Sequence, residues 1–413
     1  MVEPTRRQFL AVVAAAGAAT LASSPAGAAQ TAAPAVHDTP GVFCVPVYGR
    51  SRFPAAPGEP LPRSCLVVVD ARTGLARHIP SAVVNLHGLV EPTAANPKRQ
   101  KLGIGHQSRE ILEVYSSEYG VVRAVQFPDI SFRGHGLPHA GGALISAELI
   151  SDPMKGGLLL YVDADGKEIS RHATGGLRPH EIVDCGELYA VAHYGDRVPD
   201  RTKAAEPEPA GRLMFDLFEP SVTFLNKSDL AVVARHILPL EGAITHLSPQ
   251  SDGTVLAMGM NAWAGVGHGF LHEYAARDHT TLLPLELASG IYERYVPIYR
   301  VSPEGGLMET IQALPHQMRR GQSFATAGSV AVGTYAASQT LFVRAPGVPD
   351  RWLNTLSMGV ADPRGAAAVG DSGLVAISGN SDNIAVVDLK TGRINQLIGV
   401  PLGAHSHLYW QPS

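Results

Sequence analysis

The chain has 413 residues, a formal net charge of −4, 43 glycines and 31 prolines. Frequent glycine and proline, few charged helix-forming stretches, and short runs of Leu, Val and Ala are typical of a β-rich globular protein. The charge lacks the basic surplus of a nucleic-acid binder. Past the N-terminal region, no apolar stretch is long enough to cross a bilayer.

The N-terminal region has the pattern of an export signal. Thr5-Arg6-Arg7-Gln8-Phe9-Leu10 precedes a mild apolar run that ends in small residues, which is typical of a twin-arginine signal. The run is too short and too rich in alanine for a comfortable membrane span. We expect a signal peptide over 1–29, a flexible linker over 30–40 and a mature protein in the periplasm. An ordinary secretory signal or a retained anchor is the alternative.

The three cysteines, Cys44, Cys65 and Cys185, cannot all pair with one another. An oxidising compartment permits a Cys44–Cys65 disulfide with Cys185 left over, and the sequence does not decide whether that bridge forms. The chain has no Cys-x-x-Cys motif. Thiolate zinc sites and covalently attached c-type haem are therefore not expected.

One plan recurs along the chain: an apolar strand, a tight polar turn and a second strand. Asp and Gly in the turns supply the side-chain hydrogen bond and the backbone freedom that tight turns need. The clearest copies have turns at 70–74, 163–167 and 388–392, and weaker copies have turns at 116–120, 226–229, 302–305 and 346–350.

Seven such turns, spaced mostly by about 40–50 residues, predict a repeat architecture of β-propeller type. We expect an all-β, seven-bladed β-propeller over 41–413, with the closing blade shared by N- and C-terminal strands at 42–48 and 405–410. A pair of stacked β-sandwiches is the rival fold. Two insertions interrupt the period: an exposed loop at 196–212, and 263–298, which holds a possible short helix at 285–293.

The 17 histidines are placed in a pattern. His135, His180 and His246 each stand six or seven residues before a glycine that opens the next strand. In this register they occupy one position on the innermost strands of three successive blades. His407 in the closing blade, His87 and His139 are further candidates, whereas the last two blades have Gln322 and Ala367 near the matching places.

Imidazoles that converge from several strands predict a transition-metal site. Neutral imidazole is a common ligand of zinc, copper and iron. Glu181 and Asp362 could accept hydrogen bonds from the outer ring nitrogens and orient the rings. The alternative is a polar propeller axis in which each histidine bonds only a backbone carbonyl.

Arginines interleave with these histidines. Arg133, Arg178 and Arg364 lie in the same segments, and guanidinium groups suit carboxylates and phosphates. Arg133, Arg178 and Glu181 are therefore candidates for binding a small anion or organic acid. Pairing of the arginines with Glu181 or Asp362 is the alternative.

Hydrolase motifs are weak. The chain has no Gly-x-Ser-x-Gly, and His-Glu at 180–181 and 272–273 does not continue as His-Glu-x-x-His. The glycine-rich segment 265–269 neither follows a clear strand nor opens a clear helix, so it does not predict a phosphate loop. No motif by itself predicts catalysis.

Segments 176–182, 189–192, 219–225 and 244–247 resemble a family of twin-arginine-exported, YVTN/WD40-like propellers that is catalogued as a domain of unknown function. The resemblance covers most of the mature chain and is strongest over 130–262. The family has Gly-His-Gly at the position of His135, Pro-His-Glu at His180 and His-Leu at His246. It has Asn-His-Leu near the C-terminus, where this chain has Ser406-His407-Leu408.

Genes of this family often lie beside those of periplasmic iron-uptake proteins, so the resemblance implies a metal-related role and periplasmic metal-uptake partners. The leading hypothesis is a periplasmic propeller that binds iron, copper or zinc, or a metal-linked partner, through axial histidines. One alternative is a metal-dependent oxidoreductase or lactonase that acts on a small acidic substrate. Another is a protein–protein interaction scaffold that uses the propeller rim.

Overall fold

A computed structural model describes residues 41–48, 64–92, 98–152, 156–195, 219–240, 242–261 and 296–412. These residues belong to one compact unit, His37–Ser413. The predicted signal peptide and linker, the loop at 196–212 and the possible helix at 285–293 lie outside the described residues.

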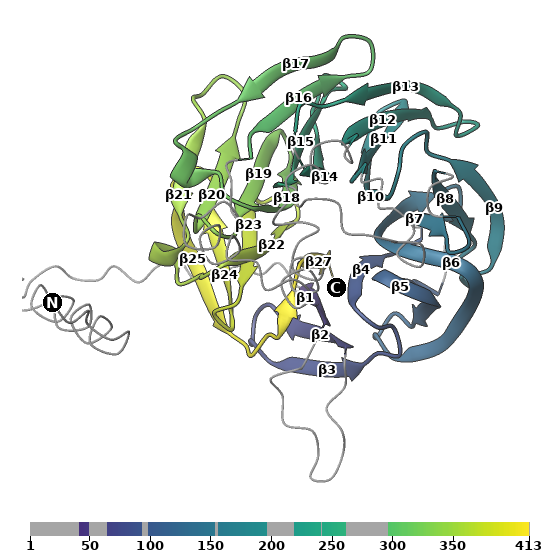
Figure 1. Cartoon of the computed structure of the whole chain (residues 1–413). Helices are drawn as coiled ribbons and strands as arrows, with labels where there is room; N and C mark the ends of the chain where they lie inside the picture. The colour runs from purple at the N-terminus through teal and green to yellow at the C-terminus, as the bar shows by residue number, and fades with distance from the viewer. Residues whose placement is uncertain are drawn as a thin grey trace, which may run out of the picture. The chain divides into compact units, whose positions relative to one another are not determined.

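The described chain is almost entirely antiparallel β-structure, arranged as sheets around a common axis (Figure 1). One sheet joins the two ends of the described chain: β1 (Gly41–Tyr48), β2 (Ser64–Asp70), β3 (Ala76–Pro80), β26 (Ala404–His405) and β27 (Tyr409–Pro412). The next has six strands: β4 (Leu86–Val90), β5 (Lys101–Tyr115), β6 (Val121–His139), β7 (Gly142–Leu149), β8 (Gly157–Val162) and β9 (Glu168–Ala173).

Four further sheets have four strands each, in sequence order. The first two contain β10 (Pro179–Cys185), β11 (Leu188–His193), β12 (Ser221–Asn226), β13 (Val232–Ile237), then β14 (Gly242–Pro249), β15 (Val255–Asn261), β16 (Ile298–Ser302) and β17 (Gly306–Ile311). The last two contain β18 (Gly321–Ala327), β19 (Val330–Tyr335), β20 (Thr340–Arg344), β21 (Arg351–Asn354), then β22 (Pro363–Ala368), β23 (Leu374–Gly379), β24 (Asn383–Asp388) and β25 (Arg393–Gly399). Two short 3-10 helices, η2 (Pro315–Gln317) and η3 (Leu356–Met358), complete the described elements.

All seven predicted turns are confirmed as connections between consecutive strands, from β2–β3 to β24–β25. The turn after β2 shows the predicted chemistry. The Asp70 carboxylate accepts a hydrogen bond from the Thr73 backbone N–H at 2.7 Å, and the Gly74 N–H donates to the Asp70 carbonyl at 2.9 Å. These local bonds fix the turn without help from distant parts of the chain.

Burial follows the position of a strand in its sheet. The middle strands β2 and β19 are buried along nearly their whole length, whereas the last strands β9 and β13 alternate between exposed and half-buried residues. The cores lie between neighbouring sheets. One core joins Val332 and Leu341 of one sheet to Ile377 and Val387 of the next. A strand covered on both faces needs apolar residues at every position, which explains the missing alternation in the sequence.

The closing sheet is built from both ends of the described chain, as predicted. β1 pairs with β27 from Gly41–Pro412 to Cys44–Tyr409, and the Phe43 and Trp410 rings pack with centroids 5.0 Å apart. The first strands of the sheets lie nearest the axis in Figure 1. The sheets thus surround an axis and do not form the two layers of stacked sandwiches.

The Cys44–Cys65 disulfide permitted by the sequence is absent. Cys44 lies opposite Val68 and Cys65 opposite Val47. Their side chains belong to different cores on the two faces of the sheet, and all three cysteines are buried thiols outside any disulfide. The β-pairing of the two strands therefore separates the sulfur atoms that sequence proximity allowed to meet.

Thiol counting tests this arrangement. Burial raises the pKa of Cys44 and of Cys185 to about 12, so both remain protonated near pH 8 and the folded protein should react slowly with Ellman's reagent. Unfolded without a reductant, the protein should expose three reactive thiols. A count of one reactive thiol would contradict the structure and would indicate that a disulfide joins the other two cysteines.

Candidate metal centre

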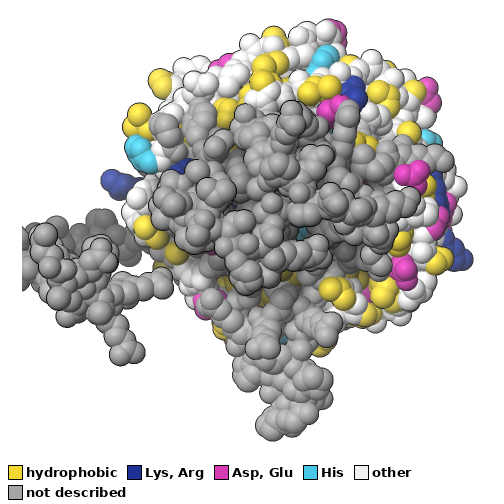
Figure 2. Space-filling view, in the orientation of Figure 1, with side chains coloured by type: hydrophobic (Ala, Val, Ile, Leu, Met, Phe, Trp, Pro, Cys, Tyr) yellow, Lys and Arg dark blue, Asp and Glu magenta, His cyan; other side chains and the backbone are white. Residues whose placement is uncertain are grey.

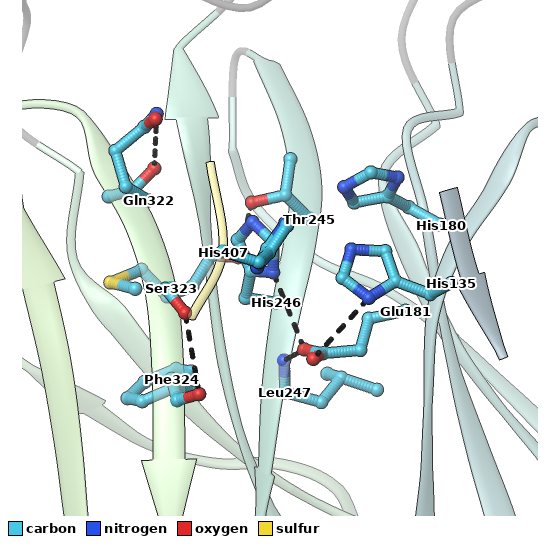
Figure 3. A network of polar contacts seen from close by, with 12 residues as sticks. His135, His180, Glu181, Thr245, His246, Leu247, Gln322, Ser323, Phe324 and His407 are labelled. Carbon is cyan, nitrogen blue, oxygen red and sulfur yellow. Dashed lines mark hydrogen bonds and ion pairs between the residues drawn. The ribbon is translucent and has the colours of Figure 1, made fainter. Parts of the chain in front are cut away.

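Six histidines gather around the axis. They are His87 on β4, His106 on β5, His135 on β6, His180 on β10, His246 on β14, and His407 between β26 and β27. Neighbouring rings in this set have centroids 4.3 to 5.5 Å apart. Five of the six side chains are buried, and His106 is half-buried. Figure 3 shows four of these rings facing one another.

Irregular β-pairing aims these rings. The register shifts between Leu86 and Gly88, so His87 has no partner in the ladder. It shifts again between Phe132 and Gly136, around His135, and between Pro179 and Ile182, around His180. A bulge turns a side chain that would otherwise point into the space between sheets. The first strands thereby direct their imidazoles toward the axis.

Four of the six histidines are close enough to share one ion. His87, His135, His180 and His407 each offer a ring nitrogen, and these four atoms lie within 4.8 Å of one another. Four nitrogens at about 2.0–2.1 Å from a tetrahedral ion would be about 3.4 Å apart. A small inward movement of the rings would therefore suffice for coordination.

Hydrogen bonds set the orientation of two rings. The His180 Nδ1–H donates to the Arg133 carbonyl at 2.7 Å, and the His106 Nδ1–H donates to the same carbonyl at 3.1 Å. A proton on Nδ1 leaves the Nε2 lone pair available. The His87 and His407 Nε2 atoms lie 2.8 Å apart, so this pair shares one proton when no ion is present.

Glu181 lies beside two further rings. Its carboxylate oxygens are 3.9 Å from His135 Nδ1 and 3.5 Å from His246 Nδ1 (Figure 3). The Leu247 backbone N–H donates to the same carboxylate at 2.6 Å and holds it in place. A carboxylate that faces the outer nitrogen of a ligating histidine fixes the tautomer and makes the ligand more basic. The structure thus places Glu181 beside two of the predicted histidines, at ion-pair distances that are longer than hydrogen bonds.

Burial keeps the central imidazoles neutral. It lowers the pKa of His87, His135, His180 and His407 well below the usual range, and the neighbouring histidines lower each pKa further. Burial also lowers the pKa of His106 to about 3. Neutral imidazole is the form that binds metal ions, so the cluster does not need to lose protons near neutral pH before it can coordinate.

Two of the three predicted arginines pair with a different carboxylate from the ones expected. Arg133 NH1 lies 3.5 Å from Glu148 Oε1, and Arg178 Nε lies 3.8 Å from Glu148 Oε2. Glu148 is on β7, a strand that the sequence pattern did not connect to the site. Arg364 pairs with Asp362 at 2.8 Å, as the alternative predicted, and Asp362 also accepts a hydrogen bond from the Asn380 side-chain amide.

Two sequence predictions need adjustment. The His139 ring contacts Tyr161 and Tyr189, and its Nδ1 is 2.9 Å from the Tyr189 hydroxyl, so it is not among the clustered histidines. Ala367 pairs regularly with Ala376, whereas the register shift of β22 falls at Arg364. The site position in that sheet therefore belongs to Arg364.

His106 was not predicted from the sequence, because the predicted histidines were expected on the innermost strands and His106 lies on β5, the second strand of its sheet. β5 pairs with β4 up to Gly105 and with β6 from His106 onward. The available signal was the pair Gly105-His106, which matches Gly134-His135 on the neighbouring strand.

A separate polar groove lies between two sheets, lined by Asp252, Arg300, Glu309 and Arg344 among others. Its charges neutralise one another: Arg300 pairs with Asp252, and Arg344 pairs with Glu309 and Asp350. The charged groups of this groove are therefore already paired, which makes it a weaker candidate site than the axis.

Among the described residues, no helix has the length and apolar character needed to span a membrane.

Comparisons with known proteins show the fold. No protein-family model and no curated protein sequence matches the chain. Among solved structures, a catalytically inactive virginiamycin B lyase from Staphylococcus aureus, solved with quinupristin, matches with a TM-score of 0.50 and 9% identity. The match covers 78% of this chain and 86% of the lyase. With 1071 matching chains, the β-propeller architecture is too widely shared to choose a function.

Close packing at Gly134 supports the position of the His87 ring. A Cβ atom at Gly134, where φ is +103°, would lie 2.5 Å from His87 Cδ2, whereas a Cβ at Gly141, with φ +89°, would meet nothing within 4 Å. We expect Gly134→Ala to lower the free energy of unfolding by about 1–3 kcal/mol more than Gly141→Ala. Both substitutions impose a similar backbone penalty, so the difference reports the clash. Equal losses in urea unfolding would show that the axis tolerates displacement of His87.

Proposed function

We propose that this protein is an exported β-propeller that binds a transition-metal ion on its axis through His87, His135, His180 and His407. One observation carries the proposal: four buried imidazoles, distant in sequence, place ring nitrogens within 4.8 Å of one another. His246 lies against the same group, with ring centroids 5.0 Å from His407 and 5.2 Å from His180. Zinc, copper and iron all accept such a set.

A purely structural histidine cluster explains the contacts less well. The carbonyl contacts satisfy only the Nδ1 atoms of His106 and His180. His135 Nε2 is buried without a hydrogen-bond partner, and an unsatisfied buried polar atom costs about 1–3 kcal/mol. An ion would use that lone pair and would replace the close Nε2–Nε2 contact of His87 and His407 with two coordinate bonds. When bound, such an ion supplies Lewis acidity.

The finer parts of the proposal come from the sequence. We propose twin-arginine export to the periplasm and a metal-uptake partner, as the family resemblance implies. We also propose seven blades, with the six-stranded sheet counted as two. In support, β6 is 19 residues long, and it pairs with β5 over 121–126 and 131–133 and with β7 over 130–139.

An enzymatic role is the second candidate. The similar propeller in Staphylococcus aureus is named as a lyase, and four protein ligands leave further positions free on an ion that prefers five or six. An oxidoreductase or lactonase acting on a small acidic substrate fits this possibility.

The interaction-scaffold alternative has no specific support. Along the part of the rim visible in Figure 2, charged side chains of both signs are scattered among apolar ones, which favours no particular scaffold partner.

Metal titration of the exported, chelator-treated protein tests the proposal. We expect one equivalent of Zn²⁺, Cu²⁺ or Fe²⁺ to bind, and His180→Ala to weaken binding by at least about 100-fold, because it removes one of four ligands. His139→Ala is the matched control. It removes a half-buried histidine of the same region that contacts tyrosines, and it should leave metal affinity unchanged.

Two results would overturn the proposed function. One is a protein that takes up none of these ions. The other is equal loss of affinity in both histidine variants, since that would place the ion away from the axis.

Glu181 gives a finer test of the same centre. We expect Glu181→Gln to weaken metal binding by about 10–100-fold, because an amide cannot enhance the basicity of the ligand His135 as a carboxylate does. Glu309→Gln, on the outer groove, removes an equal charge and should have no effect. Unchanged affinity in Glu181→Gln would show that the carboxylate does not support the ligands. Calorimetry on the folded variants provides the measurement.

A further inference from the structure

We infer that His246 is a fifth ligand of the metal centre, so that the site favours an ion with five or six coordination positions over an ion held by four ligands. This inference rests on the proposed metal site and names the residue that determines which ions the site accepts. It follows from the way in which the histidine rings are arranged around the axis.

Five of the clustered rings have the contacts of a square pyramid. The His135 ring contacts all the others, with centroid distances of 4.5 Å to His180 and His407, 5.1 Å to His87 and 5.5 Å to His246. Those four rings contact one another in a closed cycle, at 5.2 Å for His87–His180, 5.2 Å for His180–His246, 5.0 Å for His246–His407 and 4.3 Å for His407–His87. Among the ring contacts of these described residues, none joins His87 to His246 or His180 to His407. His135 thus takes the apex, and the other four rings form the base.

The ring separations fit coordination of one ion. With ring nitrogens at about 2.0–2.1 Å from an ion, neighbouring imidazoles would have centroids about 4.5–5.2 Å apart. The distances from His246 to His180 and His407 lie in this range, and the distance to His135 lies just above it. His246 is not one of the four residues whose ring nitrogens lie within 4.8 Å of one another. Its ring therefore has to move inward further than the other four to reach the ion.

The backbone and a carboxylate position His246 in the same way as His135. The β14–β15 register shifts between Ile244 and His246, and the His246 side chain is buried. The Nδ1 atoms of His135 and His246 both face Glu181, at 3.9 and 3.5 Å (Figure 3). Each ring therefore has its Nε2 on the side away from the carboxylate. One carboxylate that faces the outer nitrogens of two rings would support both of them as ligands.

His106 lies outside this pyramid. Its ring contacts those of His87 and His180, each at 4.9 Å, and its Nε2 is 3.5 Å from the Tyr194 hydroxyl oxygen. A sixth ligand opposite His135 would have to contact all four rings of the base. His106 thus touches two proposed ligands without completing the set, which makes it the matched control for His246.

The number of ligands decides which ions the site favours. Zinc in structural sites is almost always held by four ligands in a tetrahedron. Nickel(II) and copper(II) prefer square-planar or tetragonal sets of nitrogen and oxygen ligands. A square base of four imidazoles with His135 at the apex suits such an ion and leaves one position, opposite His135, for an exogenous ligand.

Paired titrations with Ni²⁺ and Zn²⁺ test the inference on the full mature protein after removal of metal with a chelator. We expect His246→Ala to weaken Ni²⁺ binding by about tenfold or more and Zn²⁺ binding by less than about threefold, because zinc needs only the four remaining ligands. His246→Phe should give the same result. It fills the space of the ring without a nitrogen lone pair, so it keeps the test valid if the alanine variant folds poorly because of a cavity.

His106→Ala provides the control for a merely structural effect. It removes an imidazole that packs against two proposed ligands, so any disturbance of the cluster should change the affinities for both ions by a similar factor. The ratio of Ni²⁺ to Zn²⁺ affinity should therefore fall in the two His246 variants and stay constant in His106→Ala.

The outcomes separate this inference from the proposed function. Failure of the wild-type protein to bind either ion would overturn both. Binding that His180→Ala weakens and the His246 variants do not would overturn the inference alone. Equal loss of Ni²⁺ and Zn²⁺ affinity in the His246 variants would also overturn it, since His246 would then not discriminate between the ions. A wild-type protein that binds Zn²⁺ and not Ni²⁺ would have the same consequence.

Discussion

The pairing of β1 with β27 brings the two ends of the described chain into one sheet, and the geometry of the axis depends on it. His407 lies in the C-terminal segment that this pairing holds, and His87 lies on β4, 320 residues earlier. Their Nε2 atoms nevertheless lie 2.8 Å apart. No local interaction can produce that contact. It requires every intervening sheet to take its place around the axis. The histidine cluster therefore forms only when the ring of sheets is complete.

Register shifts in β4, β6 and β10 direct histidine side chains toward the axis. A regular strand would alternate its side chains between the two neighbouring sheets, and those directions are filled by the apolar cores. The register shifts around His87, His135 and His180 release these residues from that alternation. Burial then keeps the imidazoles neutral, and the Arg133 carbonyl and Glu181 settle which nitrogens face outward. Backbone geometry thus organises the cluster.

Much of this arrangement could be predicted from the sequence because the signals are local. Turns such as 70–74 carry their own hydrogen-bonding residues, and the spacing of His135, His180 and His246 from the following glycines reports their strand position. Contacts that depend on neighbouring strands were not predictable. Glu148 reaches Arg133 and Arg178 from β7, and His106 enters from a second strand. His139 shares β6 with His135, but the bulge between Phe132 and Gly136 separates their directions.

Crystals of the exported protein, measured at the absorption edges of iron, copper and zinc, provide the most direct examination of the axis. The account predicts one anomalous peak about 2.0–2.2 Å from ring nitrogens of His87, His135, His180 and His407. Ordered water at that position in metal-supplemented crystals, with the His87 and His407 nitrogens still in contact, would contradict it.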